Sequence, residues 1–346
     1  MSQCKAILDT PAELNEVVCK MQLGSTHYGV TKSLIDGNVS PDYAKILFKK
    51  FVSRVLIEVS AYCNRKCVFC PNKSGLRITK SLRQVGMEQN LLSGIVSRLE
   101  EIDYNRNIVL HLYNEPMSDP DLANKVAYIT SRLDKAAVWF NTNGDYLTHD
   151  ALVDLAEAKL TKLAVSLYGP NHGEYDKDYL SQAFERIFKA VGQKGEIMHP
   201  NSVNMNSRLS FEHNGWKIPI SIFASDFNVI GYDRGETIDG FDTSRTSPCP
   251  AVFSEFNIAY DGTIVPCCNV HPHEASHSDY VIGKLKDPRD MFEIFANSAL
   301  KDWRHDLIKF DTYKSPCDSC TRLNYPELQS TAEAALFNDT VSQLLK

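Results

Sequence analysis

The stretch SAYCNRKCVFCPN, residues 60–72, decides how the rest of the chain is interpreted. It places Cys63, Cys67 and Cys70 in a C-x3-C-x2-C array directly after the apolar run 55–59, which predicts a buried strand. The three thiols are therefore expected on a loop at the carboxyl end of a strand. Active sites of parallel α/β folds form at that edge of the sheet, so the array predicts a functional loop.

Three thiolates on one short loop suit a cubane iron–sulfur cluster. Such a cluster has four irons, so three cysteines leave one iron without a protein ligand. An open metal position implies a substrate or cofactor there, by the logic that separates catalytic from structural zinc sites. The alternatives are a zinc site or buried thiols. Zinc usually takes four protein ligands in paired C-x2-C units, and no fourth ligand is adjacent, so the array favours the cluster.

The composition is that of a folded, mildly acidic protein. Of 346 residues, 43% are hydrophobic and 23% are charged, so a sizeable core can form. A net charge of −6 gives no basic footprint for nucleic acid or an anionic membrane. We see no signal peptide and no apolar stretch approaching the ~18 residues of a membrane span. Ten cysteines without an export signal indicate metal or redox chemistry in a reducing compartment, so we expect a cytoplasmic protein.

Beyond the array, apolar strands alternate with amphipathic helices. This alternation predicts βαβ units and a parallel sheet, open or closed into a barrel. Between residues 195 and 216 the pattern blurs, and no element is predicted there. The expected strands span 108–112, 137–141, 160–167 and 217–223, and the expected helices span 87–102, 119–133, 148–158 and 179–191.

Two further regions flank this alternating core. The first, residues 1–52, predicts a helical extension, because two amphipathic segments in it open with Pro at a first helical turn. The second begins after residue 231, where Gly, Asp, Thr and Pro mark a domain boundary. In it, Asp261-Gly262 between apolar runs predicts a hairpin. Helices are expected at 11–21, 41–51, around 289–308 and from 330 to the end.

The array Cys63-x3-Cys67-x2-Cys70, with Phe69 before the last cysteine, resembles the signature of the radical S-adenosylmethionine (radical SAM) superfamily. The resemblance implies a partial (β/α)6 TIM-like barrel as the core, over residues 53–232. It also implies that the open iron of a 4Fe–4S cluster chelates S-adenosylmethionine (SAM). One-electron reduction by a protein such as flavodoxin or ferredoxin then yields a 5′-deoxyadenosyl radical, which abstracts a hydrogen atom.

Downstream segments fit the same family and supply its SAM-binding candidates. The segment YNEP, residues 113–116, stands where the family has Gly-Gly-Glu-Pro, whose glutamate contacts the methionyl amino group; Tyr and Asn replace the glycines. The segment 140–144 resembles the family's third-strand end, and Ser166 its fourth-strand serine. Each alone is an ordinary loop residue. The candidates are Phe69, Asn114, Glu115, Pro116, Asn141, Asn143 and Ser166.

A second cysteine set resembles the twitch form of the SPASM family, a short C-terminal cap with one auxiliary 4Fe–4S cluster. We expect it over residues 233–329, followed by a C-terminal helix over 330–346. Four cysteines imply full ligation, which suits an electron relay or a structural role. A hairpin followed by C-x2-C is also how zinc ribbons are built, so structural zinc is the alternative. The set is Cys249, Cys267, Cys317 and Cys320.

Arg234 and Cys268 are the catalytic candidates. Carbohydrate-acting relatives place an arginine near the substrate hydroxyl, where Arg234 stands; the alternative is a salt bridge at the domain junction. Cys268 points the other way off the strand from Cys267. It is a hydrogen-atom donor, a buried thiol, or the ligand in place of Cys267. The histidines of residues 271–277 lie among Pro, Ser and Glu, which predicts a solvated loop rather than a further metal site.

The resemblance implies a radical SAM oxidoreductase or epimerase. Members with one fully ligated auxiliary cluster include a cyclitol dehydrogenase and an aminoglycoside epimerase. We therefore expect hydrogen abstraction from a carbinol carbon of a sugar, cyclitol or nucleoside-like small molecule, leading to dehydrogenation or epimerisation. One alternative is a radical SAM peptide maturase, although residues 1–52 look too short and too helical for a leader-recognition domain. The alternative from another class is a zinc-stabilised binding protein without catalysis.

Overall fold

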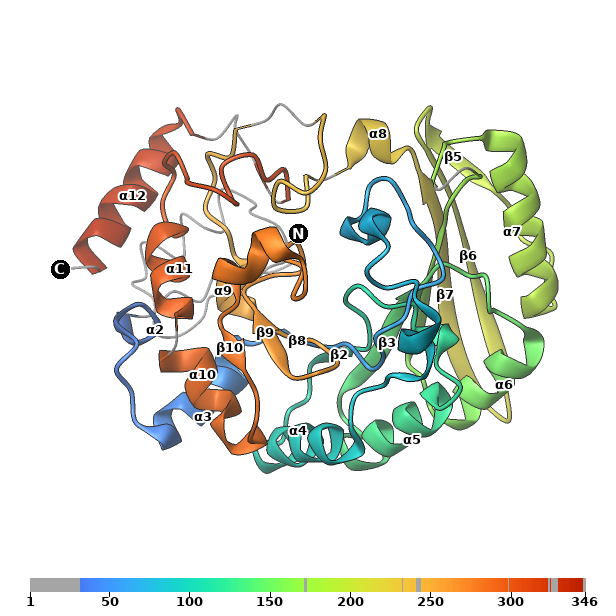
Figure 1. Ribbon diagram of the computed structural model, residues 1–346, viewed down its shortest axis with the longest axis horizontal. Helices are drawn as coiled ribbons and strands as arrows, with labels where there is room; N and C mark the ends of the chain where they lie inside the picture. Colours follow the sequence, from blue (N-terminus) through green and yellow to red (C-terminus); the bar gives the residue numbers. More distant parts are fainter. Residues whose placement is uncertain are drawn as a thin grey trace. The chain divides into compact units, whose positions relative to one another are not determined.

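The computed structural model describes residues 32–170, 173–231, 233–240, 244–297, 299–322, 324 and 329–344 (Figure 1). The chain divides into two compact units. The core unit comprises Leu56–Gly231 and Ile258–Gly262, and the cap unit comprises the rest of the chain. The boundaries expected at 52/53, 232/233 and 329/330 stay predictions.

The core unit is built on the parallel sheet that the sequence predicts. Its strands lie in the order β1-β2-β3-β4-β7-β6-β5, and the pairs β2–β3, β3–β4 and β4–β7 are parallel. Apolar residues fill the strands because both faces of such a sheet are covered. The parallel strands are β1 (Arg54–Ile57), β2 (Asn107–Val109), β3 (Ala137–Thr142), β4 (Lys162–Leu167) and β7 (Trp216–Ser225).

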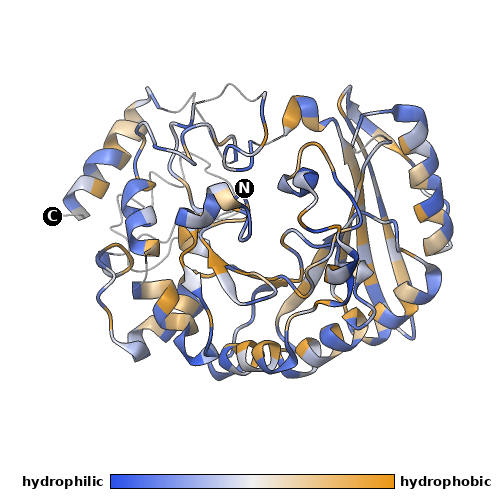
Figure 2. Cartoon of the chain, viewed as in Figure 1, coloured by the Kyte–Doolittle hydropathy of each residue, from blue (hydrophilic) through white to orange (hydrophobic). Residues whose placement is uncertain are grey.

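The helices of the core unit begin and end within a few residues of their predicted bounds. They run along one side of the sheet in Figure 1, and each carries apolar and polar residues in Figure 2. Helix ends follow local chemistry: the Asp176 carboxylate accepts from the Tyr179 amide, and Gly192 ends α7 with a φ of 75°. These helices are α4 (Gln89–Glu101), α5 (Leu122–Arg132), α6 (His149–Glu157) and α7 (Lys177–Val191), followed after β7 by α8 (Phe227–Ile230).

A long hairpin occupies the region where no element was predicted. Strands β5 (Met198–Asn201) and β6 (Asn204–His213) are antiparallel, and β6 pairs along its length with β7. The turn between β6 and β7 contains Asn214 and Gly215, with φ of 48° and 75°. Asn-Gly is a strong hairpin signal, and it stands in the sequence at this turn. The blurred apolar pattern has a physical cause, because every residue of β5 is exposed.

The cap unit contains helices from both ends of the chain. The predicted helix 41–51 is confirmed as α3, the hairpin around Asp261-Gly262 is confirmed, and the segment 289–308 forms two short helices. The predicted helix 11–21 lies outside the described residues. The elements are α2 (Lys32–Asp36), α3 (Pro41–Phe51), α9 (Ala251–Ser254), β8 (Glu255–Ile258), β9 (Thr263–Val265), β10 (Gly283–Lys284), α10 (Met291–Asn297), α11 (Leu300–Asp306) and α12 (Ala332–Leu344).

Aromatic packing holds the centre of the cap unit together. The ring of Phe48 on α3 lies edge-on to three other rings, with centroid separations of 5.0–5.4 Å. All four rings are buried, and edge-to-face pairs stabilise a core beyond the area that they bury. The three neighbours are Phe256, Phe292 and Phe295. Among the helices of the described residues, none is both long and apolar enough to cross a membrane.

We expect Phe48→Ala to lower the free energy of unfolding by about 3–5 kcal/mol, because it leaves a cavity among three rings. Ile46→Ala on the same helix is the control, since Ile46 is 57% exposed and its loss is expected to change stability by under about 0.5 kcal/mol. Urea titrations of the two apo variants measure both values. Equal losses for the two would contradict this account of the cap core.

Candidate active site

The three cysteines of the array lie on the loop that follows β1, as predicted. Cys67 is buried, and Cys63 and Cys70 are half-buried. The backbone closes around them, because the Cys70 amide donates to the Cys67 carbonyl at 3.0 Å. The Cys63 amide donates to the carbonyl of Arg77 at 3.1 Å, near the far end of the same loop. The short 3₁₀ turns η1 (Pro71–Ser74) and η2 (Lys80–Gln84) complete this segment.

The electrostatics of these thiols fit a metal cluster. Burial raises the pKa of Cys67 to about 12, with a further rise from the charge of Cys70. Burial also raises the pKa of Cys63, and the charges of Glu115, Cys70 and Cys67 add to it. The three sulfurs therefore lie near one another in a place where bare thiolates are unfavourable. Bound metal compensates for this, because coordination deprotonates a thiol outright.

The positions of the possible metal ligands also show whether a single metal ion could bind. Within the described residues, no three His, Cys, Asp or Glu side chains converge as they would on one ion. A cubane has a different requirement, because each thiolate binds a separate iron and the sulfurs need not meet at a point.

A buried ion pair anchors both ends of the cysteine loop. Arg77 Nη2 donates to Glu58 Oε2 at 3.1 Å, and Arg77 Nη1 donates to the Ala61 carbonyl at 3.0 Å. Glu58 is 0% and Arg77 2% exposed. Glu58 Oε1 accepts from the Tyr113 amide at 3.0 Å, and Oε2, which also binds Arg77, accepts from the Tyr260 amide at 3.3 Å. The pair was not predicted from the sequence, although a Glu inside the apolar run 55–59 signals a buried charge that needs a partner.

A second ion pair fastens the middle of the loop. Arg65 binds the Asp145 carboxylate through Nε at 2.7 Å and Nη2 at 2.6 Å, and Asn64 Nδ2 adds a bond of 2.8 Å. Burial raises the pKa of Asp145, but Arg65 and Asn64 outweigh it and hold that pKa below its usual value. Bidentate contact fixes orientation as well as distance. The loop is thus attached to the end of β3.

Glu115 is buried next to the cysteine loop. Its Oε1 accepts from Thr142 Oγ1 at 2.6 Å and from the Met117 amide at 3.0 Å, and its Oε2 accepts from the Asn143 amide at 2.7 Å. Burial raises the pKa of Glu115 to about 7, against the opposing effect of these hydrogen bonds. The Glu115 amide also donates to the Tyr62 carbonyl at 2.8 Å. The carboxylate is therefore fixed and can change charge near neutral pH.

The other predicted SAM-binding residues differ in their surroundings. Asn143 Nδ2 donates to Asn64 Oδ1 on the cysteine loop at 2.7 Å, and Asn114 Nδ2 donates to Ser60 Oγ at 3.1 Å. The amide of Asn141, by contrast, donates to His111 Nδ1 at 2.9 Å. Ser166 is buried on β4, and Pro116 opens the 3₁₀ turn η3 (Pro116–Ser118). The structure thus joins Asn114, Glu115 and Asn143 to the loop through direct bonds.

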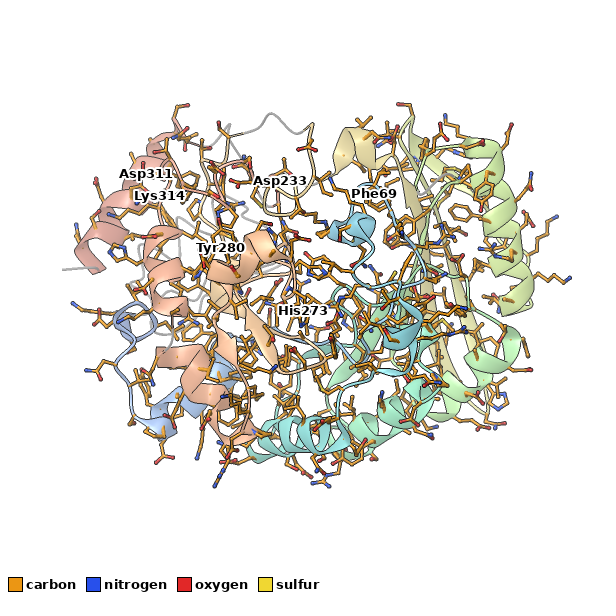
Figure 3. All side chains as sticks on the ribbon, in the orientation of Figure 1. Phe69, Asp233, His273, Tyr280, Asp311 and Lys314 are labelled. Carbon is orange, nitrogen blue, oxygen red and sulfur yellow. The ribbon has the colours of Figure 1, made fainter. Side chains whose placement is uncertain are left out.

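Phe69, labelled in Figure 3, is held between two aromatic rings and a glycine. Its ring stacks on Phe227 with centroids 4.1 Å apart and lies 5.1 Å from Tyr168. Gly173 has a φ of 125°, and a Cβ there would come 2.4 Å from Phe69 Cε1. Only a glycine fits both the backbone and the space, so the orientation of Phe69 is fixed.

The second cysteine set gathers in the cap unit. Burial raises the pKa of Cys317, and the charges of Cys267, Cys249 and Cys320 raise it further. Burial likewise raises the pKa of Cys267 and of Cys320. The Cys320 amide donates to the Cys317 carbonyl at 3.3 Å, so the C-x2-C pair forms one turn. The set has the same donor chemistry as the first loop and fits a metal cluster for the same reason.

Two guanidinium groups accompany these thiols. Burial opposes the charge of Arg322, but the charges of Cys268 and Glu255 raise its pKa well above the usual value. Arg322 binds Glu255 through both Nη atoms, at 2.6 and 3.2 Å. Arg245, 2% exposed, donates to the backbone carbonyls of Arg322 and Cys320 at 2.6 and 3.4 Å. Cys268 is half-buried within this positive field. Neither Arg245 nor Arg322 was predicted from the sequence, because no motif marks them.

The loop that carries Arg234 is also in the cap unit. Its Nη1 donates to Asn269 Oδ1 at 3.1 Å. The prediction of a solvated histidine loop is wrong, because His271 is 0% and His277 1% exposed. Hydrogen bonds inside the protein connect them: the His271 amide donates to His277 Nδ1 at 2.8 Å, and His277 Nε2 donates to the Gly235 carbonyl at 2.7 Å.

A cavity of about 460 Å³ opens in the cap unit and reaches Cys317. Aromatic and charged side chains line it, three of which Figure 3 labels. No sequence signal pointed to this cavity, since its walls come from the turn that ends at Tyr280, from α11 and from the segment between 307 and 317. They include Tyr280, Trp303, Asp311 and Lys314.

Comparison with known families agrees with this geometry. Residues 57–204 match the radical SAM superfamily, and residues 249–321 match SPASM, an iron–sulfur cluster-binding domain. Residues 57–204 thus form a radical SAM domain, and residues 249–321 form a SPASM domain. These two domains imply a radical SAM enzyme with a 4Fe–4S cluster, an auxiliary cluster and SAM as cofactors, in place of the zinc alternative.

The chain also resembles individual proteins of known name or structure. The chain is 31% identical over 132 residues to an S-adenosyl-L-methionine-dependent 2-deoxy-scyllo-inosamine dehydrogenase of Niallia circulans; the match covers 37% of this chain and 51%, about half, of that protein. The crystal structure of BtrN in complex with AdoMet and 2-DOIA has a TM-score of 0.55 at 20% identity, covering 79% of this chain and 94% of that one. An open form of BtrN has a TM-score of 0.46 at 19% identity, covering 75% and 86%. The similarity to the BtrN complex with AdoMet and 2-DOIA supports the partial-barrel fold.

We expect Glu58→Gln to impair loading of the cysteine loop selectively, because it removes the negative charge that binds the buried guanidinium of Arg77. After anaerobic reconstitution, iron should fall from about eight to about four per chain, since the cap site is unaffected. Glu100→Gln is the control, because Glu100 pairs with Arg132 on the surface. Iron and sulfide analysis, with circular dichroism to check folding, measures the effect. The same iron content in both variants would refute the anchoring role.

Proposed function

We propose that this enzyme abstracts a hydrogen atom from a carbinol carbon of a sugar, cyclitol or nucleoside-like small molecule and oxidises it to a carbonyl. The observation that carries the proposal is the unequal pair of cysteine sets. One has three thiols beside a buried carboxylate, which leaves room for a SAM-bound iron, and the other has four. The named activity of the Niallia circulans relative, a dehydrogenase of an amino cyclitol, supports the substrate class.

In this proposal, Cys63, Cys67 and Cys70 hold the first cluster, and Glu115 binds the amino group of SAM. When bound, the two clusters and SAM supply a 5′-deoxyadenosyl radical and a one-electron acceptor. The bonds from Thr142, Met117 and Asn143 orient the Glu115 carboxylate, so no reorganisation is needed when the ammonium arrives. Phe69 is fixed by its neighbouring rings and offers an apolar face to the nucleoside.

We assign to the cap unit the removal of the electron and the proton that follows hydrogen-atom abstraction. Oxidation of a carbinol to a carbonyl removes a hydrogen atom, an electron and a proton. The hydrogen atom ends on 5′-deoxyadenosine, and the electron requires an acceptor, which we assign to a cluster held by Cys249, Cys267, Cys317 and Cys320. The proton passes from the hydroxyl to solvent water, while Arg234 donates a hydrogen bond to the hydroxyl oxygen. Guanidinium stabilises the developing alkoxide charge and keeps its own protons.

Cys268 distinguishes dehydrogenation from epimerisation. An epimerase returns a hydrogen atom to the carbon-centred radical and consumes no external acceptor, so it needs a donor such as a thiol. Cys268 lies beside Cys267 in the field of Arg322. We favour dehydrogenation, in which Cys268 gives up no hydrogen atom. The enzyme then needs a reducing protein such as flavodoxin or ferredoxin for the first cluster, and we place it in the cytoplasm, where thiols stay reduced.

The proposal is tested by incubating the anaerobically loaded enzyme with SAM, dithionite and a panel of cyclitols, amino cyclitols, sugars and nucleosides, with peptides as a separate arm. We expect one 5′-deoxyadenosine for each carbonyl product, measured by mass spectrometry, and the same product from Cys268→Ala. A product inverted and deuterated at one carbon in heavy water, and lost in Cys268→Ala, would identify an epimerase instead. Turnover of peptides alone would contradict the substrate class.

SAM binding should strengthen as the pH rises towards neutrality. Because the pKa of Glu115 is raised to about 7, its carboxyl is neutral at pH 6 and increasingly charged above pH 7. Between pH 6 and 7.5 we expect the Kd for SAM to fall by up to about tenfold. The Kd follows the ionised fraction of Glu115, which rises about tenfold for each pH unit below the pKa. Glu115→Gln should bind weakly and without this dependence. Equilibrium dialysis with cluster-loaded protein measures the Kd of the wild type and of Glu115→Gln. The same pH dependence in both would contradict the assignment of Glu115 as the ligand of the SAM amino group.

A further inference from the structure

One buried amide connects Arg234 to the second cysteine set. Asn269 is 3% exposed and follows Cys267 by two positions. Its Nδ2 donates to Cys320 Sγ at 3.4 Å, and its Oδ1 accepts from Arg234 Nη1 at 3.1 Å. The three groups form a chain of hydrogen bonds that runs from a guanidinium to a thiol and lies within the cap unit.

The direction of this chain is set by the chemistry of its ends. A guanidinium has donors and no acceptor, so it can only face the oxygen of the Asn269 amide. The amide nitrogen is thereby turned towards Cys320. A positive charge behind the carbonyl also polarises the amide and strengthens the N–H group at its other end. Arg234 therefore acts on the sulfur through Asn269.

The backbone around Arg234 is strained, and several contacts hold it. Arg234, Gly235 and Glu236 have φ of 52°, 65° and 68°, a conformation that is unfavourable for the two non-glycine residues. The buried carboxylate of Asp233, labelled in Figure 3, accepts from Ser319 Oγ at 2.7 Å, and Ser319 stands between the last two cysteines. With the bond from His277 to Gly235, the loop is fixed against the cysteine segment at separate points.

We propose that Asn269 is a positioning residue that couples Arg234 to the auxiliary cluster and raises its reduction potential. An N–H group directed at a ligand sulfur stabilises the negative charge that reduction adds, and such bonds are a main determinant of cluster potentials. The coupling makes the cluster a better one-electron acceptor at the place where Arg234 meets the substrate. It rests on the proposed ligand role of Cys320 but not on the identity of the substrate.

The test is an EPR-monitored redox titration of the loaded, substrate-free enzyme. SAM perturbs the signal of the first cluster only, so its addition identifies the auxiliary signal. In Asn269→Leu, which keeps the volume and loses the donor, the ratio of reduced to oxidised auxiliary cluster at a fixed potential should fall about threefold to tenfold. For one electron, a tenfold change is a shift of about 59 mV to lower potential. Asn297→Leu is the control, because the Asn297 amide bonds the backbone of Val39 instead.

A second variant tests the coupling without touching the sulfur. Arg234→Leu should shift the potential in the same direction by a smaller amount, and the shift should vanish when residue 269 is already Leu. An unchanged potential in Asn269→Leu, or an equal effect of Arg234→Leu in both backgrounds, would overturn the proposal. If Asn269→Leu does not hold its auxiliary cluster, the proposal is tested by Arg234→Leu alone. A lower potential of the auxiliary cluster in that variant supports the proposal, and an unchanged potential overturns it. An enzyme with no auxiliary signal at all would refute the ligand assignment, whereas inactivity towards carbinols would leave these potentials unaffected.

Discussion

The contact between Arg77 and Glu58 is the constraint on which the first site depends. It joins the end of strand β1 to the far end of the cysteine loop, and Glu58 also accepts from the amide just before Asn114 and Glu115. Both charges are buried, so removing either partner takes away the opposite charge that the other faces in the interior. One ion pair therefore sets the position of the thiols relative to the carboxylate proposed to bind SAM, and the parallel sheet supplies the rigid base.

In the cap unit, a different set of charges surrounds the cysteines. Its thiols are buried beside Arg322 and Arg245, and cations near a ligated cluster offset its negative charge. The strained loop at Arg234 is connected to the same cysteine segment through Asn269 and through the bond from Ser319 to Asp233. Substrate contact and electron acceptance are thus assigned to adjacent parts of one unit. This arrangement suits a reaction in which the two events must follow one another.

Much of the fold could be predicted because its signals are local. Apolar periodicity gave the strands and helices, and cysteine spacing gave both candidate sets. The anchoring pairs were missed because their partners are distant: Arg77 follows Glu58 by 19 positions, and Asp145 follows Arg65 by 80. Strands β5 and β6 were missed because β5 has no buried face, although Asn214-Gly215 marked the turn between β6 and β7. The histidine loop was misjudged because polar composition does not exclude burial when polar groups find partners inside the protein, as both ring nitrogens of His277 do.

The central claim is that Cys63, Cys67 and Cys70 hold a cubane whose fourth iron is left for SAM. Mössbauer spectroscopy of enzyme reconstituted with ⁵⁷Fe, recorded before and after addition of SAM, tests it most directly. The account predicts that SAM changes the isomer shift and quadrupole splitting of one iron in the first cluster and leaves the cap cluster unchanged. A spectrum that SAM does not alter, in protein that carries its full complement of iron, would contradict it.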